Sequence, residues 1–113
     1  MSTLKIHEGL LKLINDEMER AVDKYGDLAS GHEAYAVMLE EYQEAQEETN
    51  YLGDVLYRFW SRVKGNKEDF DEMLPHILDA SLKAAAELIQ VAAVAQRYEQ
   101  QLKENEDEDN GRV

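Results

Sequence analysis

Apolar residues recur at three- and four-residue steps along almost the whole chain, and this spacing limits the possible folds more than any other feature. Only one proline and six glycines are present to interrupt a helix. Valine, isoleucine and threonine do not form the alternating runs that indicate strands. The pattern therefore predicts an all-α fold, an antiparallel bundle of three to four helices that is completed by oligomerisation.

Cap and turn residues divide this pattern into helical segments. Gly26 suits a left-handed C-cap, and Ser30 followed by Glu33 forms a capping-box signature. Pro75 is tolerated in the first turn of a helix and is disruptive later, so we place a helix start there. The predicted helices cover residues 3–24, 30–63, 68–74 and 75–103. Residues 1–103 are expected to form a single domain, and residues 104–113 a disordered acidic tail that has almost nothing to bury.

The charge balance excludes several classes of partner. The chain has 25 acidic and 12 basic residues, a formal net charge of −13. This field repels nucleic acid backbones and anionic lipid, so we expect neither duplex binding nor membrane association. The absence of cysteine excludes disulfides and thiolate metal sites and suits a reducing compartment, so a cytoplasmic location is expected. A chain of 113 residues often gains stability by self-association, here as a homodimer or homotetramer.

One acidic residue interrupts the most apolar part of the chain. Residues 84–95 are apolar nearly all round, except for Glu87 and Gln90. A bare carboxylate in such surroundings is costly, so Glu87 is expected to be protonated, ion-paired or bound to a metal. Lys83, one turn earlier, offers an ion pair as the alternative to a metal.

A dense group of glutamates marks the predicted helix at 30–63. Most acidic groups of this kind are simply solvated faces. However, Glu41, Glu44 and Glu48 share one strip, where they repel one another unless a cation intervenes. Three carboxylates and an amide oxygen from two helices would suit Mg²⁺, which retains positions for water and phosphate. The sequence therefore predicts a divalent-metal phosphate site.

The two acidic motifs together resemble a known family. Glu40-Glu41-x-x-Glu44 followed by Glu87-x-x-Gln90 is similar to the signature of the MazG-like all-α nucleoside triphosphate pyrophosphatases, especially the short members from Gram-positive bacteria and their phages. Gln90 stands where that signature has aspartate. The resemblance implies a helical bundle that forms dimers or tetramers, binds Mg²⁺ and hydrolyses nucleoside triphosphates to monophosphate and pyrophosphate. It also implies metal-ligand positions at Glu41, Glu44 and Glu87, with Gln90 at the fourth motif position.

Roles for other residues follow if the protein is an enzyme. Glu40 or Glu48 would position and deprotonate the attacking water. Contacts with the nucleotide are predicted for four residues that also have ordinary surface, core or ion-pair roles: Lys24, Tyr25, Lys83 and Arg97. His32 and His76 have no partner at ligand spacing and receive no role. Two functions remain open: a magnesium-dependent pyrophosphohydrolase that clears noncanonical or surplus nucleotides, and a catalytically silent bundle that binds a nucleotide or a protein.

Overall fold

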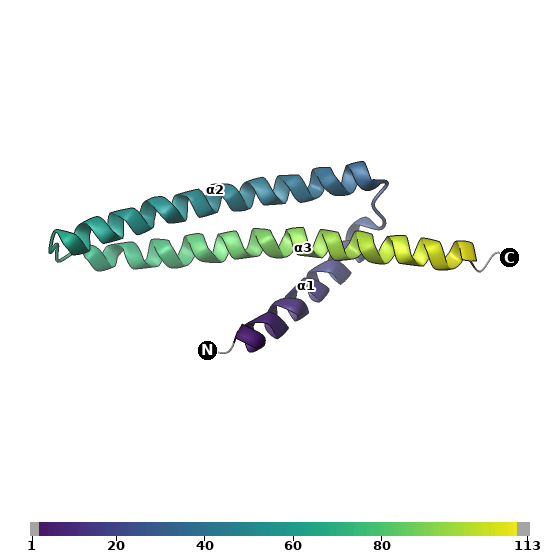
Figure 1. The fold of residues 1–113 in the computed structure, drawn as a ribbon, viewed down its shortest axis with the longest axis horizontal. Coiled ribbons are helices and arrows are strands. Elements are labelled where there is room, and N and C mark those ends of the chain that lie inside the picture. The colour runs from purple at the N-terminus through teal and green to yellow at the C-terminus, as the bar shows by residue number, and fades with distance from the viewer. Residues whose placement is uncertain (1–2, 111–113) are drawn as a thin grey trace. The chain divides into compact units, whose positions relative to one another are not determined.

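The computed structural model describes residues 3–110, and these residues are almost entirely helical. The elements in chain order are α1 (Thr3–Tyr25), α2 (Gly31–Lys64), the short 3-10 helix η1 (Phe70–Met73) and α3 (Leu74–Asn110) (Figure 1). No strand occurs within the described range, so the all-α prediction is confirmed. None of the helices in this range has an apolar stretch sufficient to span a lipid bilayer.

The helix boundaries differ from the predicted ones mainly near the C-terminus. α2 begins and ends one residue after the predicted range, and Pro75 is the second residue of α3, where a missing N–H is tolerated. α3 continues to Asn110 rather than ending near Lys103, because glutamate is a good helix former. Residues 104–108 are exposed. A disordered tail at 104–113 stays a prediction, and its last three residues lie outside the described range.

The connection between α1 and α2 contains the predicted caps. Gly26 has a φ of +72°, in the left-handed region that favours glycine, and its N–H donates to the carbonyl of Val22 at 2.9 Å. The hydroxyl oxygen of Ser30 accepts a hydrogen bond from the N–H of Glu33 at 3.2 Å. The Glu33 carboxylate accepts from the N–H of Ala29, also at 3.2 Å, one residue earlier than the capping box predicts.

The chain forms two compact units, of which the first combines residues 1–41 with residues 89–113. In this terminal unit, α3 holds the α1–α2 connection through its side chains. The Gln101 amide both donates to the Leu28 carbonyl at 2.6 Å and accepts from the Leu28 N–H at 2.8 Å. A small core forms beside this connection, from Leu28, Ala34 and Val94 with Val37, Met38 and Tyr98 packed against them.

The second unit, residues 42–88, is a helical hairpin. In this hairpin unit, α2 and α3 run antiparallel and side by side, joined through η1 (Figure 1). Near the turn, the rings of Phe59 and Phe70 lie 6.1 Å apart, and Arg62 Nη1 donates to the Asp69 carbonyl at 3.1 Å. A single domain at 1–103 stays a prediction. α2 and α3 each contribute to both units, and α1 belongs to the terminal unit alone.

Candidate metal centre

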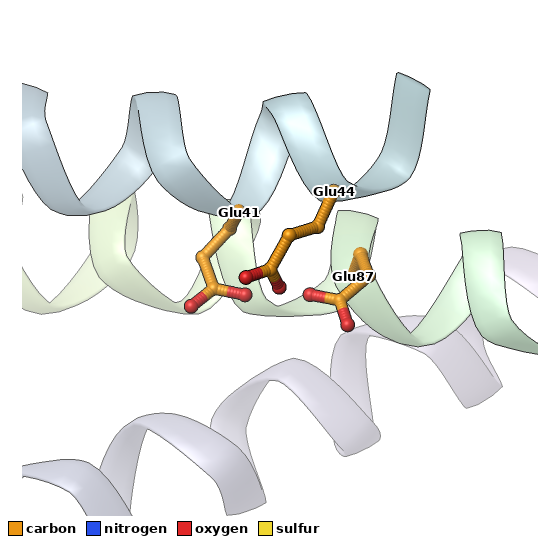
Figure 2. A group of neighbouring side chains, drawn as sticks. All are labelled: Glu41, Glu44 and Glu87. Atoms are coloured by element: carbon orange, nitrogen blue, oxygen red, sulfur yellow. The ribbon is translucent and has the colours of Figure 1, made fainter. Parts of the chain in front are cut away.

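Three carboxylates from α2 and α3 come together. Glu41, Glu44 and Glu87 each offer an oxygen, and these oxygens lie within 4.8 Å of one another (Figure 2). Glu41 and Glu87 are half-buried, whereas Glu44 is exposed. The sequence prediction that the 41/44 pair lies beside residue 87 is therefore met by the geometry, while metal binding itself stays a prediction.

Local helix geometry and small side chains account for this arrangement. Glu41 lies one turn before Glu44 on the uninterrupted helix α2, so the two side chains share one face. Next to the acidic residues, Ala45 on α2 and Ala84 on α3 are buried. Alanines at a helix–helix contact allow close approach, which brings side chains beside the contact within reach of each other. The Ala-rich sequence around Glu87 thus serves to bring α3 close to α2.

The electrostatics of the group are those of crowded like charges. The Glu87 carboxyl raises the pKa of Glu44 above its ordinary value, first through a shared hydrogen bond and then through charge repulsion. Slight desolvation and the nearby charge of Glu47 act in the same direction. Such a group gains stability from a shared proton or from a cation that neutralises both carboxylates.

Lys83 is directed to a different carboxylate from the predicted one. Its ammonium lies 3.1 Å from Asp79, one turn before it on α3, in an exposed i,i+4 ion pair. Asp79 raises the pKa of Lys83 by a hydrogen bond and by its charge, and the charge of Glu48 adds to this effect. Helical spacing alone predicted Glu87 as the ion-pair partner, although Asp79 is also one turn away from Lys83.

Gln90, the predicted fourth ligand, forms a hydrogen bond with a residue for which the sequence predicted no role. The Gln90 amide nitrogen donates to the carboxylate of Glu17 on α1 at 2.8 Å. Arg20 also binds Glu17, with its Nε 3.1 Å from one carboxylate oxygen. The hydrogen bonds from Arg20 and Gln90 lower the pKa of Glu17 and keep it ionised. The position of Glu17 in the sequence could have indicated a contact with another helix, because Glu17 lies at the edge of the apolar stripe of α1, next to Met18.

The other predicted site residues fall into three groups. Glu40 is exposed, and Glu48 is half-buried one turn beyond Glu44 on α2. Lys24 and Tyr25 pair at the end of α1, where the ammonium lies 5.1 Å from the ring centroid. Arg97 is 8% exposed and donates two hydrogen bonds to the Gly26 carbonyl, at 3.1 Å from Nε and 2.6 Å from Nη2. Arg97 thus has the structural role that the sequence left open.

Comparisons with protein-family models, with curated proteins and with solved structures found no match for this chain.

Proposed function

We propose that this protein is a magnesium-dependent nucleoside triphosphate pyrophosphohydrolase of the MazG-like type. It would convert ribo- or deoxyribonucleoside triphosphates to monophosphates and pyrophosphate in the cytoplasm, as a homodimer or homotetramer. The observation that supports this proposal most directly is the approach of Glu41, Glu44 and Glu87 to within 4.8 Å of one another. An all-oxygen donor set is the one that hard cations such as Mg²⁺ prefer.

The charges of the group also suit a divalent cation. Because Glu87 raises the pKa of Glu44, the ionised form of Glu44 is disfavoured beside the Glu87 carboxyl. A cation with two positive charges would remove this repulsion. Three carboxylates do not complete the octahedral shell of Mg²⁺, which leaves positions for water and for the phosphates of a substrate.

The chain's own residues would divide the chemical work. Bound Mg²⁺ would neutralise charge on the phosphate oxygens and orient them. Glu41, Glu44 and Glu87 would hold it. Glu48 or Glu40 would accept a proton from the attacking water as its oxygen bonds to the α-phosphorus. The bond from that phosphorus to the bridging oxygen breaks, and pyrophosphate leaves with the electron pair.

Release of pyrophosphate from a panel of nucleoside triphosphates, with and without Mg²⁺, tests this proposal. Glu44→Gln and Glu87→Gln remove one charge each while retaining shape, and each is expected to lower kcat at least a hundredfold. Glu47→Gln is the matched control, since Glu47 is an exposed glutamate on the same helix and outside the three-carboxylate group. A Glu47 variant that loses as much activity as the other two would refute the assigned roles.

A specific observation favours a second function, a catalytically silent bundle that binds a nucleotide or a protein. Gln90 is neutral, and its amide nitrogen is engaged by Glu17. A centre with one charge fewer than the family signature would bind nucleotide and metal without turnover. Under this alternative, calorimetry detects nucleotide binding that depends on Glu44 and Glu87, while no triphosphate in the panel releases pyrophosphate.

A further inference from the structure

A hydrogen bond between two helices of the terminal unit holds the Gln90 side chain. The amide nitrogen of Gln90 on α3 donates to the carboxylate of Glu17 on α1 at 2.8 Å, and the two residues are 73 positions apart in the chain. Gln90 is half-buried, and the side chain of Glu17 is 21% exposed. The Nε of Arg20 also donates to both oxygens of this carboxylate, at 3.1 and 3.2 Å. Glu17 is thus held by one partner on its own helix and by one on α3.

The chemistry of Glu17 decides which end of the Gln90 amide it binds. An amide carries a donating nitrogen at one end and an accepting oxygen at the other, and the two ends have nearly the same shape. An ionised carboxylate has only acceptors, and the guanidinium of Arg20 keeps Glu17 ionised. Glu17 therefore binds the nitrogen and disfavours the reversed amide, in which two oxygens would face each other. The amide oxygen is left for another partner.

That oxygen belongs to a residue one helical turn from the candidate metal centre. Gln90 follows Glu87 by three residues on the uninterrupted helix α3, so both side chains leave the same face of that helix. Glu87 contributes a carboxylate to the three-carboxylate group. Hard cations bind amide oxygens, whereas the NH2 end of an amide only donates hydrogen bonds and carries partial positive charge. The orientation of the Gln90 amide thus decides whether this residue binds Mg²⁺ or repels it.

We propose that Glu17 is a positioning residue of the candidate metal centre: its carboxylate holds the Gln90 amide in the orientation that gives its oxygen to the cation. The proposal rests on the metal centre of the proposed function and assigns a role in it to a third helix, α1. A hydrogen bond to a carboxylate also polarises the amide and makes its oxygen a stronger ligand. Loss of such an outer partner weakens metal binding by about 10- to 100-fold in metalloproteins.

Binding of Mn²⁺ to the full chain, without nucleotide, tests the proposal. Mn²⁺ takes the same oxygen ligands as Mg²⁺, and electron paramagnetic resonance measures its free concentration. Glu17→Gln retains the shape of the side chain but allows either end of the Gln90 amide to bind it, so the dissociation constant should rise roughly tenfold. Glu19→Gln is the matched control, because Glu19 is an exposed glutamate of α1 whose replacement removes the same charge. This control should change the dissociation constant by less than about twofold.

A second background separates orientation from charge and from stability. Gln90→Glu places oxygens at both ends of the side-chain group, so its orientation no longer matters. In the Gln90→Glu background, Glu17→Gln should therefore leave the dissociation constant unchanged or lower it, since it also removes a repulsion between two carboxylates. A role through the charge of Glu17 alone predicts the same loss of affinity in both backgrounds. A role confined to tying α1 to α3 predicts a lower melting temperature of the metal-free protein and no change in Mn²⁺ affinity.

Two results with the variants would overturn the proposal. One is a Glu17→Gln protein that remains helical by circular dichroism and binds Mn²⁺ at least as tightly as the unchanged protein. The other is an equal loss of Mn²⁺ affinity on Glu17→Gln in the unchanged and the Gln90→Glu backgrounds. If the Glu17→Gln protein does not fold, Gln90→Met decides the question, because it removes the amide and retains the pair of Glu17 and Arg20. An unchanged dissociation constant of the Gln90→Met protein would then overturn the proposal.

The same measurements distinguish this proposal from the proposed function. An unchanged protein that binds no Mn²⁺ would overturn both, because no metal centre would exist. Mn²⁺ binding that requires Glu44 and Glu87 but not Glu17 would overturn the positioning role alone. Mn²⁺ binding that requires all three residues, in a protein that releases no pyrophosphate from any triphosphate, would refute the enzymatic function and support the role of Glu17.

Discussion

Replacing Arg97 by methionine should destabilise the protein without altering the candidate metal centre. Arg97 is buried, and both its Nε and Nη2 donate to the carbonyl of Gly26 at the end of α1. Methionine fills most of the volume of the arginine stem, so the change chiefly removes these hydrogen bonds. The Gly26 carbonyl then loses a charge-assisted partner in a part of the chain that packs against α3.

The expected loss in the free energy of unfolding follows from the number and kind of these hydrogen bonds. Hydrogen bonds to a charged group contribute about 1.5–3 kcal/mol net, and here the two bonds share one acceptor and so count as about one. Removing a buried guanidinium also relieves its desolvation, which offsets part of the loss. We therefore expect the free energy of unfolding to fall by about 2 kcal/mol, and the melting temperature by about 8 °C.

Urea unfolding followed by circular dichroism measures this change. Arg20→Met is the matched control, because the side chain of Arg20 is 54% exposed and pairs with Glu17 on the same helix. An exposed pair of this kind contributes less than about 1 kcal/mol. An Arg97→Met protein as stable as the Arg20→Met protein would refute the structural role. If the Arg97→Met protein also no longer bound or hydrolysed nucleoside triphosphates, Arg97 would be the phosphate contact that the sequence alone suggests.

Three further predictions concern charge, backbone and packing. Because Glu87 raises the pKa of Glu44, the folded chain binds more protons than the unfolded chain between the ordinary value of 4.5 and the raised value. The contribution of Glu44 to the stability of the metal-free protein should thus fall as pH rises through that window. In melting curves recorded with a chelator, the melting temperature of the Glu44→Gln protein should rise relative to that of the unchanged protein as pH rises. A difference between the two melting temperatures that does not depend on pH would contradict this. Gly26→Ala should lower the free energy of unfolding by about 1 kcal/mol, because φ at Gly26 is +72°. Gly9→Ala, in a helical position with open space around it, should instead raise the free energy of unfolding by up to about 1 kcal/mol. Urea unfolding that gives both changes the same sign would exclude the backbone explanation. Val55 is the largest fully buried side chain among the described residues, and Val55→Ala, which shortens it, should cost about 2 kcal/mol in the same measurement. A change below about 0.5 kcal/mol would mean that the hairpin interior collapses to fill the space.

The candidate centre was predictable only in part. The i,i+3 spacing of Glu41 and Glu44 places both carboxylates on one face of any helix, and an acidic residue among alanines marked Glu87. The interaction partners of neighbouring side chains were harder to predict from the sequence. Lys83 had a carboxylate within one turn in either direction, Asp79 and Glu87, and helical spacing does not distinguish them. The side-chain conformation in the folded structure brings the Lys83 ammonium to Asp79.

The sequence by itself determined where the helices lie, because helix formation depends on hydrogen bonds four residues apart and on caps such as Ser30 and Gly26, all of which are local. Contacts between residues far apart in the chain required the tertiary structure. The hydrogen bond from Gln90 to Glu17 and the approach of Glu87 to Glu44 depend on the register between packed helices. That register is set by the fit of many side chains at once, such as Ala45 and Ala84 at the hairpin contact, and no single spacing in the sequence encodes it.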